Sequence, residues 1–342
     1  MQDISTISEF LLQAGTQYCV YDLSRGIRPL STQQFLDIEA AQIPHPFPRQ
    51  QHGWFALLFN NKQLSGQHYI WFVKLPLDEL GKVIDAGRLE FLQIIITALG
   101  QQLENAEKAN GQLPDNPYSF VPSQQQMADF NSLSRKSLGL APSQHHAAAQ
   151  AYFSNPQQQD WQQLALQGIS DFVVFSSQTM LTNIMNEQLT HLPTQVVVSL
   201  FSSLENQTLN KTVTIAIIDW AKKHNNDNRQ VALALRALSL STAETVVSQF
   251  ISQLLSDQQQ TPLELLIVIA GRHWQKLEQD SLLLPFFEQL ANANVDEPVF
   301  APLFADLAQI PSLRERVLAI LRLPEKSAAL ADAIGQLFEQ RT

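Results

Sequence analysis

Three arginines in the second half of the chain are the residues whose type and spacing best suit binding chemistry. Arg229 and Arg236 are seven residues apart, so they share one face of a helix. Arg272 follows Arg236 by 36 residues, and His273 and Trp274 come directly after it. Arginine forms paired hydrogen bonds with carboxylates, and tryptophan is an effective interface anchor. The cluster favours recognition of an acidic segment of a partner. The alternative is that these arginines are solvated or pair with Asp and Glu of their own helices.

The histidines offer a second kind of chemistry. His45 and His52 flank a proline-rich loop, and His68 lies on the strand that follows. Together with Asp22 or Asp37 they could hold a metal ion. Their spacing matches no established ligand set, and exposed loop histidines are common, so we expect no metal site.

Motifs of catalysis and cofactor binding are missing. No two of the 12 glycines are separated by a single residue, which excludes the Gly-x-Gly fingerprint of dinucleotide binding. The P-loop, His-Glu-x-x-His and Gly-x-Ser-x-Gly patterns do not occur either. The carboxylate pairs Asp78-Glu79 and Asp296-Glu297 lie at expected helix starts, where the helix dipole favours negative charge. We therefore assign no catalytic residue and expect no cofactor.

The single cysteine, Cys19, lies in the apolar run Tyr18–Tyr21. This run predicts a buried strand position, in which the thiol behaves as a small hydrophobe. One thiol cannot form an internal disulfide, which fits a reducing compartment.

Residues 1–109 predict a small α+β domain with three or four antiparallel strands. Ser31 followed by Gln34 has the spacing of a capping box, which predicts a helix start at Thr32. The expected segments are helices near 4–11, 32–41 and 78–108, with strands near 18–23, 54–59 and 69–73. Gly81 and Gly87 could break the first turns of the last of these helices. The last two strands are apolar on both faces, so we expect a hairpin in a sheet that is covered on each side, with helices as the cover.

Residues 110–122 predict a linker, because three prolines and a glycine fall within thirteen residues. Its aromatic residues, Tyr118 and Phe120, indicate that the segment is pinned to a surface. We expect residues 1–109 and 123–342 to fold as separate units.

Residues 123–342 predict an all-α domain; only the run Phe172–Phe175 could also be a strand. Helix starts are expected near Pro193, Asn228, Pro262 and Pro298, at spacings of 35, 34 and 36 residues. A second helix is expected within each interval, so each unit is a helix pair that must stack on its neighbours. The pattern predicts a HEAT-like α-solenoid. A compact helical bundle is the alternative, because the repeat is one of length and not of residue identity.

Composition limits the possible partners. The formal net charge is −10, and both parts of the chain are acidic, whereas neutralising phosphates needs a basic excess. We therefore expect no nucleic-acid partner. The longest apolar stretches fall far short of the ~20 residues that span a bilayer, and the N-terminus lacks a secretory pattern. These features predict a cytoplasmic protein without membrane insertion.

The start of the chain and the stretch Asp115–Ser123, with Phe130-Asn131 downstream, are similar to a bacterial family of about this length. That family is described only as a domain of unknown function. The resemblance covers the whole chain and implies a bacterial cytoplasmic protein. It supplies no catalytic or binding residues.

The sequence thus predicts a mainly α protein: a small α+β N-terminal domain followed by a helical-repeat domain. We expect a non-enzymatic scaffold that binds another protein or an acidic peptide segment through Arg229, Arg236, Arg272, His273 and Trp274. The alternative is an enzyme or small-molecule sensor with a pocket between the two domains. The pattern leaves the oligomeric state open.

Overall fold

The structure, a computed structural model, describes residues 4–60, 68–104, 114–256, 260–293 and 298–339. The chain forms two compact units, Met1–Val121 with Ala305–Glu315 and Pro122–Phe304 with Arg316–Thr342. Whether residues 1–109 and 123–342 fold independently stays a prediction. Among the described residues, none of the helices combines the length and the apolar character needed to cross a bilayer.

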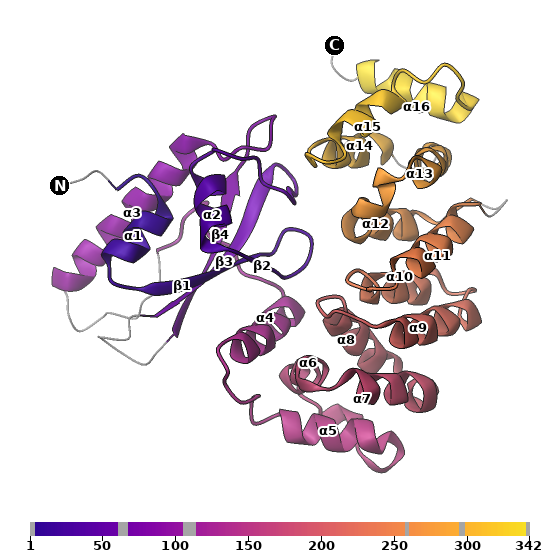
Figure 1. Cartoon of the computed structure of the whole chain (residues 1–342), viewed down its shortest axis with the longest axis horizontal. Helices are drawn as coiled ribbons and strands as arrows, with labels where there is room; N and C mark the ends of the chain where they lie inside the picture. Colours follow the sequence, from indigo (N-terminus) through magenta and orange to yellow (C-terminus); the bar gives the residue numbers. More distant parts are fainter. Residues whose placement is uncertain (1–3, 61–67, 105–113, 257–259, 294–297, 340–342) are drawn as a thin grey trace. The chain divides into compact units, whose positions relative to one another are not determined.

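The N-terminal part of the first unit contains a sheet and helices (Figure 1). Its elements in chain order are α1 (Ile7–Gln13), β1 (Gln17–Asp22), β2 (Arg28–Leu30), α2 (Thr32–Glu39), β3 (His52–Asn60), β4 (His68–Pro76) and α3 (Asp85–Glu104).

The described strands form one antiparallel sheet in the order β2-β1-β3-β4. The register places Val20 opposite both Leu30 and Leu57, and Leu57 opposite Trp71. The four-stranded sheet and the β3–β4 hairpin confirm the prediction for this unit. The residues expected to make the hairpin turn lie outside the described ranges.

One face of the sheet carries the core of the first unit. Alternate strand residues, among them Phe55, Leu57 and Val73, pack with residues of α1, α2 and α3. The capping box at α2 is confirmed, since Gln34 N donates to Ser31 Oγ and Ser31 N donates to Gln34 Oε1, both at 3.1 Å.

The segment that follows α3 runs along the edge of the sheet that β4 forms. Lys74 N donates to Tyr118 O at 2.7 Å and Phe120 N to Phe72 O at 3.2 Å, so the segment runs beside β4. Phe120 packs edge-on to Trp54 with ring centroids 4.8 Å apart, while Tyr118 packs against the core. The prediction that these two aromatic residues pin the segment is confirmed; residues 110–113 lie outside the described ranges.

Two expectations for the first unit are wrong. The long helix begins at Asp85 and not near Asp78, because Gly81 has φ +78° and Asp78 Oδ1 accepts from Leu80 N and Lys82 N at 2.8 Å in a turn. Cys19 is exposed, because it alternates with the buried Val20 along β1 and so faces away from the core.

The second unit is helical throughout its described part. Its elements are α4 (Gln124–Ser137), α5 (His146–Ser154), η2 (Pro156–Gln158), η3 (Trp161–Gln163), α6 (Leu166–Phe175), α7 (Gln178–Asn183), η4 (Ile184–Gln188), η5 (Leu189–His191), α8 (Thr194–Leu204), α9 (Lys211–Lys223), α10 (Asn228–Ala237), α11 (Glu244–Ser256), α12 (Leu263–Arg272), η6 (Trp274–Glu278), α13 (Asp280–Ala293), α14 (Phe300–Ala308), α15 (Arg314–Ile320) and α16 (Ala328–Glu339). The last residues of α14 and the first of α15 are counted with the first unit. The ambiguous run Phe172–Phe175 is part of α6.

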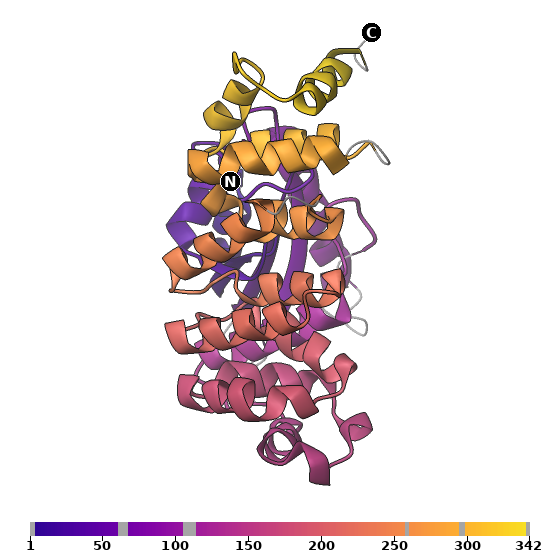
Figure 2. The same cartoon turned by 90° about the vertical axis from the view of Figure 1, so that its right-hand side faces the viewer.

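The helices of the second unit pack in two rows. In one row α4 packs on α6, α6 on α8, α8 on α10 and α10 on α12. In the other, α7 packs on α9, α9 on α11 and α11 on α13, and Figure 2 shows this row stacked in chain order. The predicted helix starts are confirmed, since α8, α10, α12 and α14 begin within two residues of the expected positions.

Candidate partner-binding site

The candidate site begins with a carboxylate at the end of α8. Glu205 is the C-cap residue of this helix, and it is only 4 % exposed. The helix dipole places partial negative charge at this end, so an acidic side chain here is unfavourable by itself. A buried carboxylate also needs a charged or hydrogen-bonding partner.

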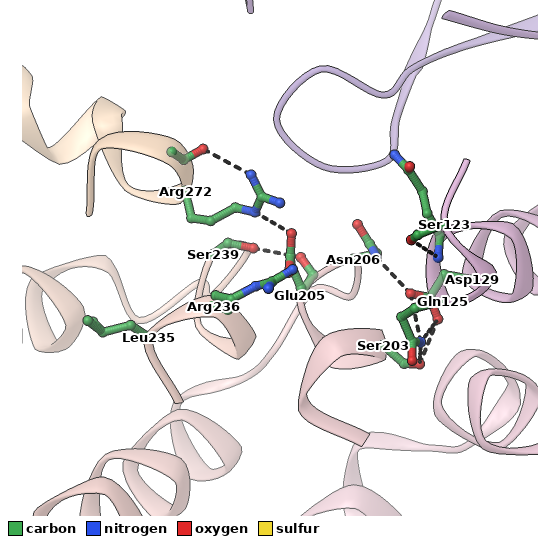
Figure 3. Close-up of polar contacts among 12 residues, drawn as sticks. Ser123, Gln125, Asp129, Ser203, Glu205, Asn206, Leu235, Arg236, Ser239 and Arg272 are labelled. Carbon is green, nitrogen blue, oxygen red and sulfur yellow. Dashed lines mark hydrogen bonds and ion pairs between the residues drawn. The ribbon is translucent and has the colours of Figure 1, made fainter. Parts of the chain in front are cut away.

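Two arginines from the next two helices of the same row supply that partner. Arg236, in the last turn of α10, donates from Nε to Glu205 Oε2 at 2.9 Å, and its Nη2 lies 2.8 Å from the same oxygen. Arg272, the last residue of α12, donates from Nε to Oε1. Each carboxylate oxygen therefore holds one guanidinium group, as Figure 3 shows. We call these three residues the arginine clamp.

The clamp has a net charge of +1 and is open on its arginine side. The side chains of Arg236 and Arg272 are 40 % and 23 % exposed, against 5 % for Glu205. In the described part of the chain, Arg236 Nη1 and Arg272 Nη2 have no hydrogen-bond partner. The arrangement can therefore bind an external anion without breaking its internal ion pairs.

A second, closed cluster lies beside the clamp. Asp129 of α4 is 2 % exposed and accepts from Ser170 Oγ of α6 at 2.7 Å and from Ser203 Oγ of α8 at 2.6 Å. Gln125 Nε2 donates to both of its oxygens, at 3.0 and 3.1 Å. Burial raises the pKa of Asp129, although these hydrogen bonds act in the opposite direction. Asp129 ties three helices together and is inaccessible to a partner.

The remaining predicted site residues lie elsewhere. His273 and Trp274 are 2 % and 4 % exposed, so the expectation that Trp274 lies on an accessible groove is wrong. His273 lies at the end of α12, with Nε2 2.7 Å from Leu235 O of α10, and Trp274 belongs to η6, which packs on α13. Both are held inside because they connect neighbouring helices. Arg229 is exposed at the first turn of α10, on the face of Arg236 but about 10 Å from it along the helix axis.

The clamp brings together Arg236 and Arg272 as the sequence predicted, but through a residue that sequence reasoning missed. Glu205 precedes Arg236 by 31 residues, close to the repeat length. The sequence did contain a signal for Glu205. It is a charged residue that directly follows the apolar sequence of α8 and lies about one repeat before Arg236. The arginines pair with a preceding helix pair and not with acids of their own units.

The histidines expected near a metal have other partners. His45 Nε2 lies 2.7 Å from Asp22 Oδ2 with both side chains fully buried, while His52 Nδ1 contacts Gln50 O at 2.8 Å. His68 Nε2 lies 3.3 Å from Asn60 Nδ2. Among the described residues, no three His, Cys, Asp or Glu side chains gather into a set that could hold a metal ion.

Comparison with known proteins identifies a family. A family model described as "Protein of unknown function (DUF3549)" matches residues 2–338. No curated protein and no solved structure matches the chain.

Proposed function

The chain belongs to the DUF3549 family of proteins of unknown function, and we propose that it is a non-enzymatic scaffold that binds partner proteins. In this proposal the second unit is a HEAT-like α-solenoid, and the partner is a protein with an acidic segment in the cytoplasm. The arginine clamp is the part of its surface that meets the acidic segment.

The spacing of polar contacts in the second unit supports the solenoid part of the proposal. Side chains of one helix pair bond to the next pair at separations close to the repeat length. Examples are Ser170 with Ser203 at 33 residues, Glu205 O with Ser239 at 34, Thr242 with Leu209 O at 33 and Lys276 with Glu244 at 32. In a solenoid each repeat contacts only its neighbours, and the stacked repeats offer an extended binding surface.

The observation that carries the binding part is the clamp itself. Two guanidinium groups are held at one point by a buried carboxylate, and each has one Nη group without a hydrogen-bond partner in the described residues. A guanidinium group has five N–H donors, so each arginine can bind Glu205 and a second carboxylate at the same time. A fixed guanidinium loses less side-chain entropy when it binds a carboxylate than a free one does.

The geometry decides which substitution tests the proposal. Reversal of both arginines to glutamate would place three carboxylates together where the ends of α8, α10 and α12 meet, and this would destabilise the unit. Glutamine keeps an N–H donor for Glu205 and removes the charge, so the double variant Arg236→Gln/Arg272→Gln is the better choice. The matched control is Lys222→Gln/Lys223→Gln, which removes two exposed charges from the last turn of α9 in the other row.

We expect the double arginine variant to lose its co-purifying proteins in cells of the native host, while the lysine control keeps them. Quantitative mass spectrometry of proteins cross-linked before lysis measures which partner proteins each variant retains. Circular dichroism should show both variants folded at the assay temperature. An unchanged set of cross-linked proteins for the folded arginine variant would show that the proposed function is wrong.

A further inference from the structure

The helices α8, α10 and α12 present equivalent positions on one accessible face. Counted from the N-cap residues Pro193, Asp227 and Pro262, the fifth positions are Val198, Ala232 and Ile267. Val198 is 38 % exposed and Ile267 is 49 % exposed, with the half-buried Ala232 between them. Because these helices pack side by side, the three residues form an apolar band that crosses the row.

One helical turn further along, the same face becomes polar and charged. The ninth positions are Ser202, Arg236 and Gly271. Residues four apart share a helix face, so this second band runs next to the apolar band. Arg236 is the clamp residue, and Gly271 directly precedes Arg272.

Gly271 leaves open space beside the clamp. Apart from its chain neighbours and the nearby backbone of its own helix, a Cβ added at this position would meet no atom within 4 Å, although the residue lies in the last turn of α12. The face therefore has open space at the residue that directly precedes the clamp residue Arg272. It also offers a position where a bulky side chain can fill that room without disturbing the fold.

We propose that this face binds an extended peptide segment in which acidic side chains alternate with apolar ones. A carboxylate of the segment takes Arg236 Nη1 and Arg272 Nη2, and an apolar side chain packs on Val198, Ala232 and Ile267. Glu205 is the positioning residue, because it fixes the orientation of both guanidinium groups. This inference rests on the proposed function and names the chemistry of the partner.

Charge complementarity favours a peptide over a polyanion. The clamp has a net charge of only +1 and stands in a chain of net charge −10. Nucleic-acid binding requires the neutralisation of several phosphates, which this surface cannot supply. The face can bind one carboxylate at a time, and its apolar residues add affinity through contacts with the same peptide.

The test uses the full chain and three fluorescein-labelled probes. The first is a ten-residue peptide that alternates leucine and glutamate, the second has glutamine in place of every glutamate, and the third is a ten-nucleotide oligothymidylate. Fluorescence anisotropy at low salt gives the dissociation constants. We expect the glutamate peptide to bind at least tenfold tighter than either other probe.

Two substitutions place the binding on the proposed face. Gly271→Phe should weaken binding of the glutamate peptide at least tenfold by filling the open space. Gly335→Phe is the matched control, because a Cβ at Gly335 of α16 also meets no atom within 4 Å, and it should change binding less than twofold. Arg236→Gln should weaken the glutamate peptide as well and leave the glutamine peptide unchanged, which checks the site by charge rather than by size.

Three results would overturn the inference: no binding of the glutamate peptide, equal binding of the glutamine peptide, or tighter binding of oligothymidylate that Arg236→Gln abolishes. Equal weakening by Gly271→Phe and Gly335→Phe would also overturn it. These failures are distinguishable from failure of the proposed function. The double arginine variant could lose its cross-linked proteins in cells while the glutamate and glutamine peptides bind equally well. That result would support the proposed scaffold function and show that the proposed acidic–apolar chemistry of the partner is wrong.

Discussion

Each unit contains a carboxylate paired with cationic or ionisable side chains, and the two differ in what they leave open. In the first unit Asp22 and His45 lie 2.7 Å apart and both side chains are 0 % exposed. In the second unit Glu205 is buried, whereas its partners Arg236 and Arg272 are 40 % and 23 % exposed. The same type of contact is closed in one unit and open in the other.

The closed cluster uses nearly all of its polar atoms internally. Asp22 accepts from Ser24 N at 3.1 Å and from Ser24 Oγ at 3.0 Å. Phe47 N donates to His45 Nδ1 at 3.0 Å, so Nδ1 is an acceptor, and His45 Nε2 lies 2.7 Å from Asp22 Oδ2. Gly53 is required beside it, because a Cβ there would lie 2.7 Å from His45 Cδ2. A cluster of this kind positions β1 and the loop before β3, and its two side chains are closed to solvent.

Removal of His45 is the largest effect that we expect. His45→Ala leaves Asp22 buried without its ring partner and opens a cavity under Gly53, and the breaking of a buried pair typically costs about 3–5 kcal/mol. Urea denaturation of the full chain measures the loss. The control is His68→Ala at an exposed position of the same sheet, which should cost less than about 0.5 kcal/mol. Equal costs for the two variants would contradict the account of the closed cluster.

His273 tests whether the second unit also has a closed polar contact next to the open clamp. Burial lowers the pKa of His273 to about 4, against the effect of its hydrogen bond with Leu235 O. The unfolded chain then binds a proton between about pH 6.5 and pH 4 that the folded chain does not. Stability is therefore fully present above pH 6.5 and falls as the pH decreases through this window, by about 3 kcal/mol.

The measurement is the difference between the wild type and His273→Gln, which keeps an N–H donor for Leu235 but does not titrate. We expect the variant to lose less stability than the wild type between pH 7 and pH 4.5 in chemical denaturation. Parallel pH curves for the two proteins would show that His273 is protonated in the folded state or accessible to water.

The sequence predicted the elements better than the contacts. Helix starts followed from proline and cap positions such as Pro262 and Ser31, because local backbone chemistry determines them. The start of α3 was placed too early because the apolar stripe continues across Gly81, although this glycine was a possible break, and its positive φ shows that it does interrupt the helix. Cys19 was misplaced because an apolar run does not reveal which face of a strand is covered.

Within the site, the sequence predicted which arginines come together but not what holds them. The 36-residue offset of Arg236 and Arg272 follows from the repeat. Glu205 as the common acceptor depends on the packing of three helix ends, which no local pattern encodes. Trp274 was misassigned because it was placed on the surface from its closeness to Arg272 in the sequence. The helix α12 ends at Arg272, so the side chain of Trp274 need not point in the same direction.

Substitution of Glu205 is expected to cause the next largest loss of stability after those at His45 and His273. Glu205→Gln gives Arg236 or Arg272 a carbonyl oxygen but turns an amide N–H₂ group toward the other arginine. The loss of one charged hydrogen bond at a buried site should cost about 2 kcal/mol. The control is Glu244→Gln, since Glu244 pairs with Lys276 at 3.1 Å but is 76 % exposed, and it should cost less than about 0.5 kcal/mol.

Thermal and urea denaturation of both variants measure this difference. A cost for Glu205→Gln as small as that for Glu244→Gln would mean that the clamp is an ordinary surface ion pair. In that case Glu205 would not fix the arginines, and the contrast between the two units would be one of burial alone.

The smallest stability effect is expected at the arginine that matters most for binding. Arg236→Gln should cost less than about 1 kcal/mol, because much of the side chain is in water and Arg272 still neutralises Glu205. The cost should shrink further as salt rises from about 0.05 to 0.5 M, since exposed charges are screened. His45→Ala should show no such salt dependence, because both partners of its pair are buried.

If Arg236→Gln costs as much as Glu205→Gln and is insensitive to salt, the arginine is a structural residue of a closed cluster. The two units would then hold their buried carboxylates in the same way, and the clamp would offer no charge to a partner.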